Sequence, residues 1–317
     1  MSAIEIRALC RDYGVGRAGD KRTQALSDVD LTVELGEVRG LVGPNGAGKT
    51  TLCKILSTVL EATSGSAEVL GHDAATDAAA VRRHIGIVFG GDRGLYGRLN
   101  ARQNLRFWAA MYGLHGAPLR LRVDELLERL GLADRAGDRV DTFSRGMKQR
   151  LHLARGLVGD PRVLLLDEPT VGMDPVAARD FRSLVGEMRA EGRTVLITTH
   201  DMAEAEAVCD LVTMIDRGRV LLTDTPSAIG EVVPRHERVV AGAVPEQTRQ
   251  ALAVLPGVVS VEAEPSGRLR VETADSSVTR TVLRLLVEAG VSDLSTQRPN
   301  LEDAYLHLIG DRGMAVG

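Results

Sequence analysis

Lysine, cysteine and the aromatic residues are scarce in this chain of 317 residues. Lysine occurs only at Lys21, Lys49, Lys54 and Lys148, and Phe, Trp and Tyr together make up 3% of the sequence. The three cysteines, at positions 10, 53 and 209, form no C-x-x-C pair and cannot all pair with one another. A disulfide framework is therefore not expected, and such reduced thiols are typical of a cytosolic protein.

Long apolar runs and an excess of positive charge are also missing. No stretch reaches the length of about 18 apolar residues that a membrane-spanning helix needs, so work at a membrane would require another polypeptide to supply the spanning helices. Residues Met1–Glu5 lack the charged-then-apolar pattern of a secretory signal. The formal net charge is -4 and basic residues are dispersed among acidic ones. A nucleic-acid partner is therefore not expected.

What the sequence does contain is an alternation of short apolar segments and helical patterns. Four apolar runs are typical of strands buried on both faces of a parallel sheet, namely Val38–Val42, Ile85–Phe89, Val163–Leu166 and Val195–Thr199. Two earlier segments, Ile4–Arg7 and Val29–Glu34, alternate in polarity like half-buried strands. Asp174 and Pro175 predict the start of a helix. The pattern indicates an α/β domain with a mainly parallel sheet. Residues 100–140 show helical patterns with no clear strand between them.

The character of the chain changes between Pro226 and Pro234. Beyond this point we predict strand, helix, strand, strand, helix and strand at 238–241, 245–255, 258–263, 269–273, 277–289 and 291–296. This order resembles a ferredoxin-like α+β unit, and a terminal helix is expected at Leu301–Ile309. We therefore expect two domains, at residues 1–234 and 235–317.

A phosphate-binding loop is the strongest functional signal. The segment from Gly43 to Thr50 matches G-x-x-x-x-G-K-[ST] and follows an apolar strand, as the motif requires. Its glycines let consecutive backbone N–H groups face phosphate, and the helix that begins at Lys49 adds the positive end of its dipole. Lys49 is expected to contact the β- and γ-phosphates of ATP, and the Thr50 hydroxyl to ligate Mg²⁺. The nucleotide-binding residues predicted here are Gly43, Pro44, Asn45, Gly46, Ala47, Gly48, Lys49, Thr50 and Thr51.

Two adjacent acidic residues follow the apolar run that begins at Val163. Asp167 and Glu168 stand at the carboxyl end of this strand, where open α/β sheets bind ligands. Asp167 is expected to hold Mg²⁺ through its water shell, and Glu168 to polarise the attacking water. An acidic loop after a strand is common, so this assignment depends on the phosphate loop upstream.

The segment Phe143–Gln149, which reads FSRGMKQ, and His200 complete a set that resembles the nucleotide-binding subunit of an ATP-binding-cassette (ABC) transporter. The resemblance covers residues 4–227, with the major motifs in family order. It implies an ABC-type P-loop NTPase core, in which an antiparallel β-subdomain and a helical insertion at about 93–140 accompany the parallel sheet.

The same resemblance assigns roles to further residues. Ser144 and Gly146 are expected to cap the γ-phosphate of ATP held by the opposite subunit, and Asp174 to lie in the loop that crosses the dimer interface. His200 matches the switch histidine that contacts the γ-phosphate, although by residue type alone a histidine after a strand is more often structural. Tyr13 lies where an aromatic ring stacks on adenine.

The chain departs from the family pattern at two places. The signature segment usually begins Leu-Ser-Gly-Gly, whereas here Arg145 stands between Ser144 and Gly146. The strand Ile85–Phe89 is usually followed by a glutamine that ligates Mg²⁺, and this chain has Gly-Gly-Asp-Arg-Gly instead. Our hypothesis is that Asp92 or a water molecule replaces the amide.

The resemblance also implies partners. One phosphate loop and one signature segment do not complete a family-type site within one chain, so we expect a head-to-tail homodimer with two ATPs between its subunits. An integral-membrane permease is the expected second partner, which places the chain peripherally at the cytoplasmic face of the plasma membrane. The insertion at 93–140 is the expected docking face, and its aromatic residues serve either this contact or the insertion's own core.

The segment 299–308 resembles the C-terminal extension of the family's exporting branch. The expected function is therefore that of an ATP hydrolase that powers export of a drug, antibiotic, lipid or polysaccharide. The alternatives are an importer ATPase and a soluble ABC ATPase that acts on ribosomes or DNA, although the paired cassettes and long coiled coils usual in the soluble members are not seen. The ferredoxin-like unit either stabilises a dimer or binds a small regulator.

Overall fold

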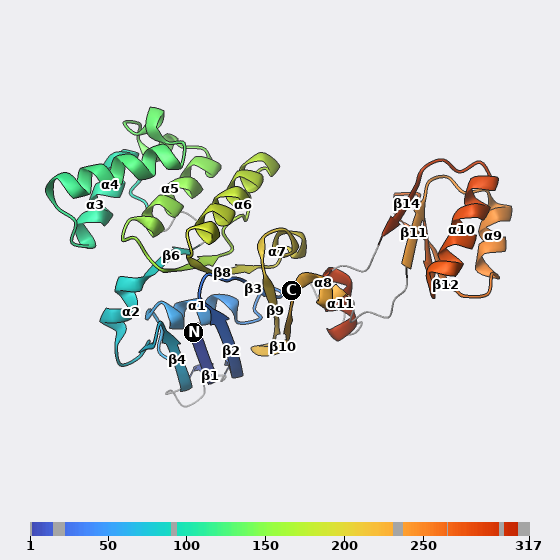
Figure 1. The fold of residues 1–317 in the computed structure, drawn as a ribbon, viewed down its shortest axis with the longest axis horizontal. Helices are drawn as coiled ribbons and strands as arrows, with labels where there is room; N and C mark the ends of the chain where they lie inside the picture. The colour runs from blue at the N-terminus through green and yellow to red at the C-terminus, as the bar shows by residue number, and fades with distance from the viewer. Residues whose placement is uncertain are drawn as a thin grey trace. The chain divides into compact units, whose positions relative to one another are not determined.

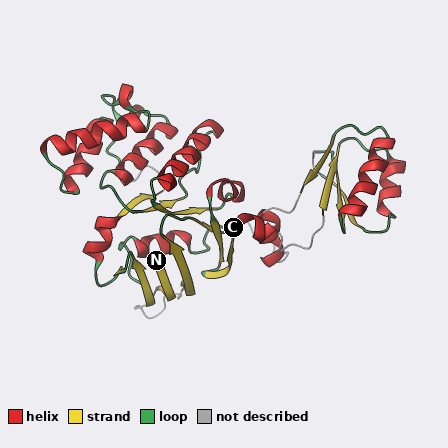
Figure 2. Cartoon of the chain, in the orientation of Figure 1, coloured by secondary structure: helices red, strands yellow, loops and turns green. Residues whose placement is uncertain are grey.

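The computed structural model describes residues 2–14, 23–89, 94–230, 237–264, 266–297 and 301–309. The chain divides into two compact units, residues 1–224 and residues 225–317. Most of their helices and strands are labelled in Figure 1, and Figure 2 colours them by type. The domain limits expected from the sequence, 1–234 and 235–317, stay a prediction.

A six-stranded sheet forms the centre of the first unit, with the strand order β10-β9-β3-β8-β7-β6. The five strands from β9 to β6 are parallel, and β10 pairs antiparallel with β9. The strands are β3 Val38–Val42, β6 Ile85–Phe89, β7 Val163–Asp167, β8 Thr194–Thr199, β9 Leu211–Asp216 and β10 Arg219–Asp224. The four predicted apolar strands are confirmed, and every residue of β3, β7 and β8 is buried.

An antiparallel sheet of order β2-β1-β4-β5 lies in the same unit. Its strands are β1 Ser2–Tyr13, β2 Thr23–Glu34, β4 Ser64–Val69 and β5 His72–Asp73. Helix α1, Lys49–Leu56, shares an apolar core with this sheet and with Leu41 and Leu165 of the central sheet. The helix that carries the phosphate loop is thereby fixed between two sheets.

The other face of the central sheet packs against helices. Leu164 and Leu166 lie in this second core while Leu165 lies in the first, because successive strand residues point to opposite faces. The helices of this unit are α2 Ala78–His84, α3 Ala101–Met111, α4 Gly116–Arg129, α5 Arg145–Leu157, α6 Pro175–Ala190 and α7 Met202–Val208, with short 3-10 turns at Ala133–Arg135 and Val140–Thr142. The predicted helical insertion is confirmed.

The second unit contains a four-stranded antiparallel sheet of order β12-β13-β11-β14. The first strand therefore lies between the third and the fourth, which is the ferredoxin-like arrangement expected from the sequence. The elements are α8 Pro226–Gly230, β11 Glu237–Ala241, α9 Glu246–Ala253, β12 Val258–Ala263, β13 Leu269–Thr273, α10 Ser276–Glu288, β14 Leu294–Gln297 and α11 Leu301–Ile309. Val239, Val271 and Leu286 lie in its core.

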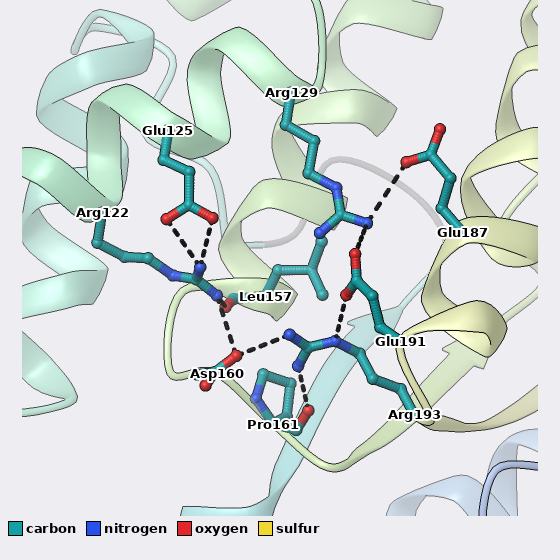
Figure 3. A network of polar contacts seen from close by, with 9 residues as sticks. All are labelled: Arg122, Glu125, Arg129, Leu157, Asp160, Pro161, Glu187, Glu191 and Arg193. Carbon is teal, nitrogen blue, oxygen red and sulfur yellow. Dashed lines mark hydrogen bonds and ion pairs between the residues drawn. The ribbon is translucent and has the colours of Figure 1, made fainter.

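A network of ion pairs joins the helical insertion to the rest of the first unit (Figure 3). Arg193, which precedes β8, binds Asp160 at 2.7 Å and Glu191 at 2.9 Å. Arg129 of α4 binds Glu191 at 2.7 Å, and Arg122 of α4 donates to the carbonyl of Leu157 at 2.7 Å. Two helical turns of the insertion are thus tied to the segments that flank β7 and β8.

These contacts have a defined pH dependence. The Arg193 guanidinium lowers the pKa of Asp160, and Arg193 and Arg129 lower the pKa of Glu191 against the opposing effect of burial. A carboxyl group whose pKa is lower in the folded than in the unfolded protein stabilises the folded state at pH values above its unfolded pKa, which is about 4 for Asp and Glu. This contribution is lost as the pH falls through the folded pKa values.

Arg193→Ala is expected to lower the free energy of unfolding at pH 7 by about 1 kcal/mol, because the arginine side chain is mostly buried and serves two carboxylates. Urea unfolding of wild type and variant at pH 7 and near pH 3 measures this difference, which should shrink at the lower pH. Arg7→Ala, which removes an exposed pair with Glu5, is the control and should change little. An equal loss at both pH values would show that packing, not charge, is responsible.

Candidate functional site

The carboxyl ends of three parallel strands bring the predicted site residues to one edge of the central sheet. Val42 of β3 pairs with Thr199 of β8, and Thr198 pairs with Asp167 of β7. The phosphate loop follows β3, Glu168 follows β7 and His200 follows β8. Segments far apart in the sequence therefore meet where parallel sheets of this kind bind ligands.

The phosphate loop adopts a conformation that its glycines make possible. Gly48 has φ 109°, and a Cβ there would lie 2.7 Å from the carbonyl oxygen of Ala25. A Cβ on Gly43 would lie 2.1 Å from the carbonyl oxygen of Ile215. Neither position has room for a side chain, so the loop can close over the N-terminus of α1 only with glycine there.

Lys49 lies inside this loop and is only 4% exposed. Its ammonium group donates to the carbonyl oxygens of Gly43 at 2.7 Å and Pro44 at 3.1 Å. It also lies 3.3 Å from Oε1 of Glu168. A buried cation is thus held at the mouth of the loop, where the N–H groups of a helix N-terminus also favour anions.

Asp167 and Thr50 form a pair of oxygen donors beside Lys49. The Thr50 hydroxyl donates to the Asp167 carboxylate, at 2.9 Å from Oδ2 and 3.1 Å from Oδ1. The Thr198 hydroxyl donates to Oδ1 at 2.6 Å and fixes the orientation of the carboxylate. Hydroxyl and carboxylate oxygens are the donors that Mg²⁺ prefers, so these residues fit the metal predicted from the sequence.

Glu168 lies beside both Lys49 and His200. Its Oε1 is 3.4 Å from Nδ1 of His200, whose side chain is about half exposed. Its backbone has φ 49°, a left-handed conformation that is uncommon for a residue with a Cβ. The backbone N–H of Glu168 donates to the carbonyl oxygen of Thr198 at 3.0 Å. Such strain is retained where the surrounding structure enforces it, which is frequent at functional sites.

Tyr13 ends β1 close to the beginning of α1. Its hydroxyl lies 3.4 Å from Oγ1 of Thr51, and the guanidinium of Arg11 covers one face of the ring at 4.9 Å from its centre. The side chain is 37% exposed. The structure therefore places Tyr13 beside the phosphate loop, with Arg11 as a neighbour that the sequence did not indicate.

Ser144, Gly146 and Asp174 belong to a second group. The Ser144 side chain caps α5 by accepting from the backbone of Met147 at 3.2 Å, and Asp174 caps α6 as predicted, accepting from Val176 and Ala177. A Cβ on Gly146 would lie 3.4 Å from Ala177, so the starts of α5 and α6 are neighbours. In the described ranges, the side-chain hydrogen bond of Ser144 stays within its own helix and does not reach the phosphate loop.

Thr198 was not predicted from the sequence as a site residue, yet it orients Asp167 and accepts from the backbone N–H of Glu168 at 3.1 Å. The available signal is a threonine at a buried strand position, because a buried hydroxyl usually has a partner. Asp92, the proposed substitute for the missing glutamine, lies outside the described residues.

A parallel sheet with a phosphate loop after β3, acidic residues after β7 and a histidine after β8 defines a P-loop ATPase of the ATP-binding-cassette type. Residues 26–171 match the family described as ABC transporter. The chain is 39% identical over 308 residues to the daunorubicin resistance ATP-binding protein DrrA3 of Streptomyces coeruleorubidus, covering 96% of each. It is 34% identical to the doxorubicin resistance ATP-binding protein DrrA of Mycobacterium tuberculosis (strain CDC 1551 / Oshkosh), covering 98% of this chain and 94% of that protein.

The chain belongs to the ATP-binding proteins of ABC transporters and is an ATP hydrolase of that family. A solved structure described as a dimeric post-hydrolysis state of the ATP-binding cassette MJ0796 with ADP and Pi has a TM-score of 0.63 and 25% sequence identity. The match covers 70% of this chain and 98% of that one. No helix in the described part of this chain is long and apolar enough to span a bilayer.

Proposed function

We propose that this chain is the ATP-hydrolysing subunit of a membrane exporter whose cargo is a drug, antibiotic, lipid or polysaccharide. The convergence of Lys49, Thr50, Asp167, Glu168 and His200 at one sheet edge carries the catalytic part of this proposal. Similarity over nearly the whole length to drug-resistance ATP-binding proteins supports export over import. The second unit lies within the matched length, so the likeness extends beyond the ATPase core.

In the proposed mechanism each residue of the edge has one task. ATP supplies the γ-phosphoryl group, and Mg²⁺, when bound, would neutralise part of its negative charge. Lys49 donates to the phosphate oxygens together with the loop N–H groups, and Thr50 and Asp167 would hold Mg²⁺. Glu168 accepts a proton from the attacking water. His200, which lies next to Glu168, orients the γ-phosphate.

The second group of residues acts across a dimer. Ser144 and Gly146 of one subunit cap the nucleotide bound to the other, and Asp174 lies in the crossing loop. The dimeric form of the MJ0796 cassette supports this arrangement. Arg145 lies against Gly172, where a Cβ would be 2.1 Å from the guanidinium carbon. Its charge is therefore held beside the loop that ends at Asp174.

A permease attaches the homodimer to the cytoplasmic face of the plasma membrane through the helical insertion. Trp108 packs against the insertion's core and donates to the carbonyl of Gly94 at 3.1 Å. Tyr96 and Phe107 make an edge-to-face contact at 5.1 Å yet stay 46% and 40% exposed. Exposed aromatic rings of this kind favour a docking role for these two, whereas Trp108 serves the core. Dimer stabilisation and regulator binding by residues 235–317 stay predictions.

The docking role is tested with the ATPase and a candidate polytopic membrane protein, purified together in detergent. The double variant Tyr96→Ala and Phe107→Ala is expected to lower the stimulation of ATP hydrolysis by the membrane protein about tenfold or more, the scale on which interface aromatics act. Val59→Ala, at an exposed residue outside the insertion, is the control. ATPase activity that no membrane protein changes would favour the soluble alternative and contradict the exporter.

A further inference from the structure

Glu204 is a buried carboxyl group that the proposed mechanism does not use. It lies in the first turn of α7, which follows His200, and its backbone N–H donates to the Asp201 side chain at 3.1 Å. The residue is only 3% exposed, and both carboxyl oxygens are buried without a hydrogen-bond partner in the described part of the chain. Burial of a carboxyl costs free energy that an apolar residue would avoid, so its presence in this helix calls for a role other than packing.

The surroundings of Glu204 connect the two catalytic segments. It lines a pocket of about 290 Å³ together with Thr170, which follows Glu168 closely in the chain. Thr199, which directly precedes His200, is tied to the same turn: its hydroxyl accepts from the backbone N–H of Asp201 at 2.9 Å, and the Asp201 side chain accepts from the backbone N–H of Glu204. One buried carboxyl group therefore lies close both to the loop after the proposed general base and to the end of the strand that precedes the histidine.

The burial of this carboxyl favours its neutral form. Burial raises the pKa of Glu204, and the hydroxyls of Thr199 and Thr170 act in the opposite direction without cancelling the rise. Asp201 also raises the pKa, while Arg182 of α6 lowers it. A neutral carboxyl is both a hydrogen-bond donor and an acceptor, which suits a site between two hydroxyls.

We propose that Glu204 is a positioning residue that keeps the loop at Thr170 and the strand end at Thr199 in a fixed position relative to each other. The side chains of Glu168 and His200 are thereby kept in the arrangement that hydrolysis requires. This inference rests on the roles proposed above for Glu168 and His200. Glu204 touches neither ATP nor the reacting atoms. Its effect is on turnover, because displacement of catalytic groups by about 1 Å can slow a reaction by about 10²-fold.

The test compares two substitutions that keep the volume of the side chain. Glu204→Met removes the polar head and is expected to lower kcat about 10- to 100-fold while the KM for ATP changes less than about twofold. Glu204→Gln keeps a donor and an acceptor and is expected to stay within about threefold of wild type. Glu206→Ala, at an exposed position of the same helix, is the control. A folded Met variant with wild-type kcat, or a Gln variant as slow as the Met variant, overturns the proposal.

Thr170→Val gives a second measurement that does not disturb the buried carboxyl itself. It removes one of the hydroxyls near Glu204 and is expected to lower kcat, as Glu204→Met does, while the midpoint temperature of thermal unfolding stays unchanged. An unchanged kcat overturns the proposal even where the Met variant fails to fold.

A double-mutant cycle shows whether Glu204 acts through His200. If it does, adding Glu204→Met to His200→Ala lowers kcat much less than it does in wild type, because the effect is not additive. Full additivity overturns the coupling. If His200→Ala and Glu168→Gln both keep wild-type turnover, the proposed catalytic roles fail. If both of these variants lose turnover and Glu204→Met does not, only the present inference fails.

Discussion

Glu168→Gln is expected to lower the kcat for ATP hydrolysis by about 10²–10⁴-fold, the usual contribution of a general base. Gln keeps the size and shape of the side chain but cannot accept the proton of the attacking water. The backbone N–H of Glu168 is held by Thr198, so the left-handed conformation should persist in the variant. ATP affinity is expected to be retained or increased, because the carboxylate that lies 3.3 Å from the Lys49 ammonium is neutralised.

Single-turnover ATP hydrolysis and equilibrium nucleotide binding measure these two effects separately. Size-exclusion chromatography with ATP should also show a dimer of Glu168→Gln that persists, because its γ-phosphate is not released. Glu61→Gln, at an exposed residue of the same unit, is the control. A variant that stays monomeric with saturating ATP would contradict the proposed dimer, and one with wild-type kcat would remove Glu168 from the catalytic role.

The strands of the central sheet that were predicted correctly are those with a continuous apolar run. The hairpin of β9 and β10 was missed, and its turn explains why. Arg217 and Gly218 both have positive φ, 46° and 76°, as a two-residue hairpin turn requires. The usual sequence signal for such a turn is Asn-Gly or Asp-Gly, and arginine in the first position hides it.

The extent of β1 was also underestimated from the sequence. The predicted segment ended at Arg7, whereas the strand continues to Tyr13. Ala8 has φ 46°, and the pairing register with β2 and β4 shifts beyond this point. Such a bulge reverses the alternation of inward and outward side chains, so a pattern with period two ends there although the strand does not.

Site residues were predictable where they belong to a local sequence motif, and were not predictable where they make contact with residues far away in the sequence. Residues 43–50 and the pair Asp167 and Glu168 are contiguous signals. The threonine that orients Asp167 lies 31 residues away in sequence, and only the pairing of β7 with β8 brings them together. Glu204 gave no signal because a glutamate in a polar helical turn is expected to face solvent.

Lys49→Ala is expected to weaken ATP binding by about 10²–10³-fold, in line with the cost of truncating one partner of a buried charge pair. The ammonium is almost fully buried and is directed by the carbonyl groups of Gly43 and Pro44. Lys54, the other lysine of α1, is in the last turn of the helix, away from the loop. Lys54→Ala is therefore the matched control and should keep the affinity of wild type.

The kinetic pattern of Lys49→Ala should differ from that of Glu168→Gln. Lys49 contacts both the loop carbonyls and the Glu168 carboxylate, so its removal affects the binding of ATP and the environment of the proposed base. KM should rise and kcat should fall, whereas Glu168→Gln should lower kcat without raising KM. Titration with a fluorescent ATP analogue, followed by steady-state ATPase kinetics, separates the two. Unchanged affinity in Lys49→Ala would mean that the loop N–H groups and the helix N-terminus bind the phosphates without the lysine, and its role would then be confined to the chemical step.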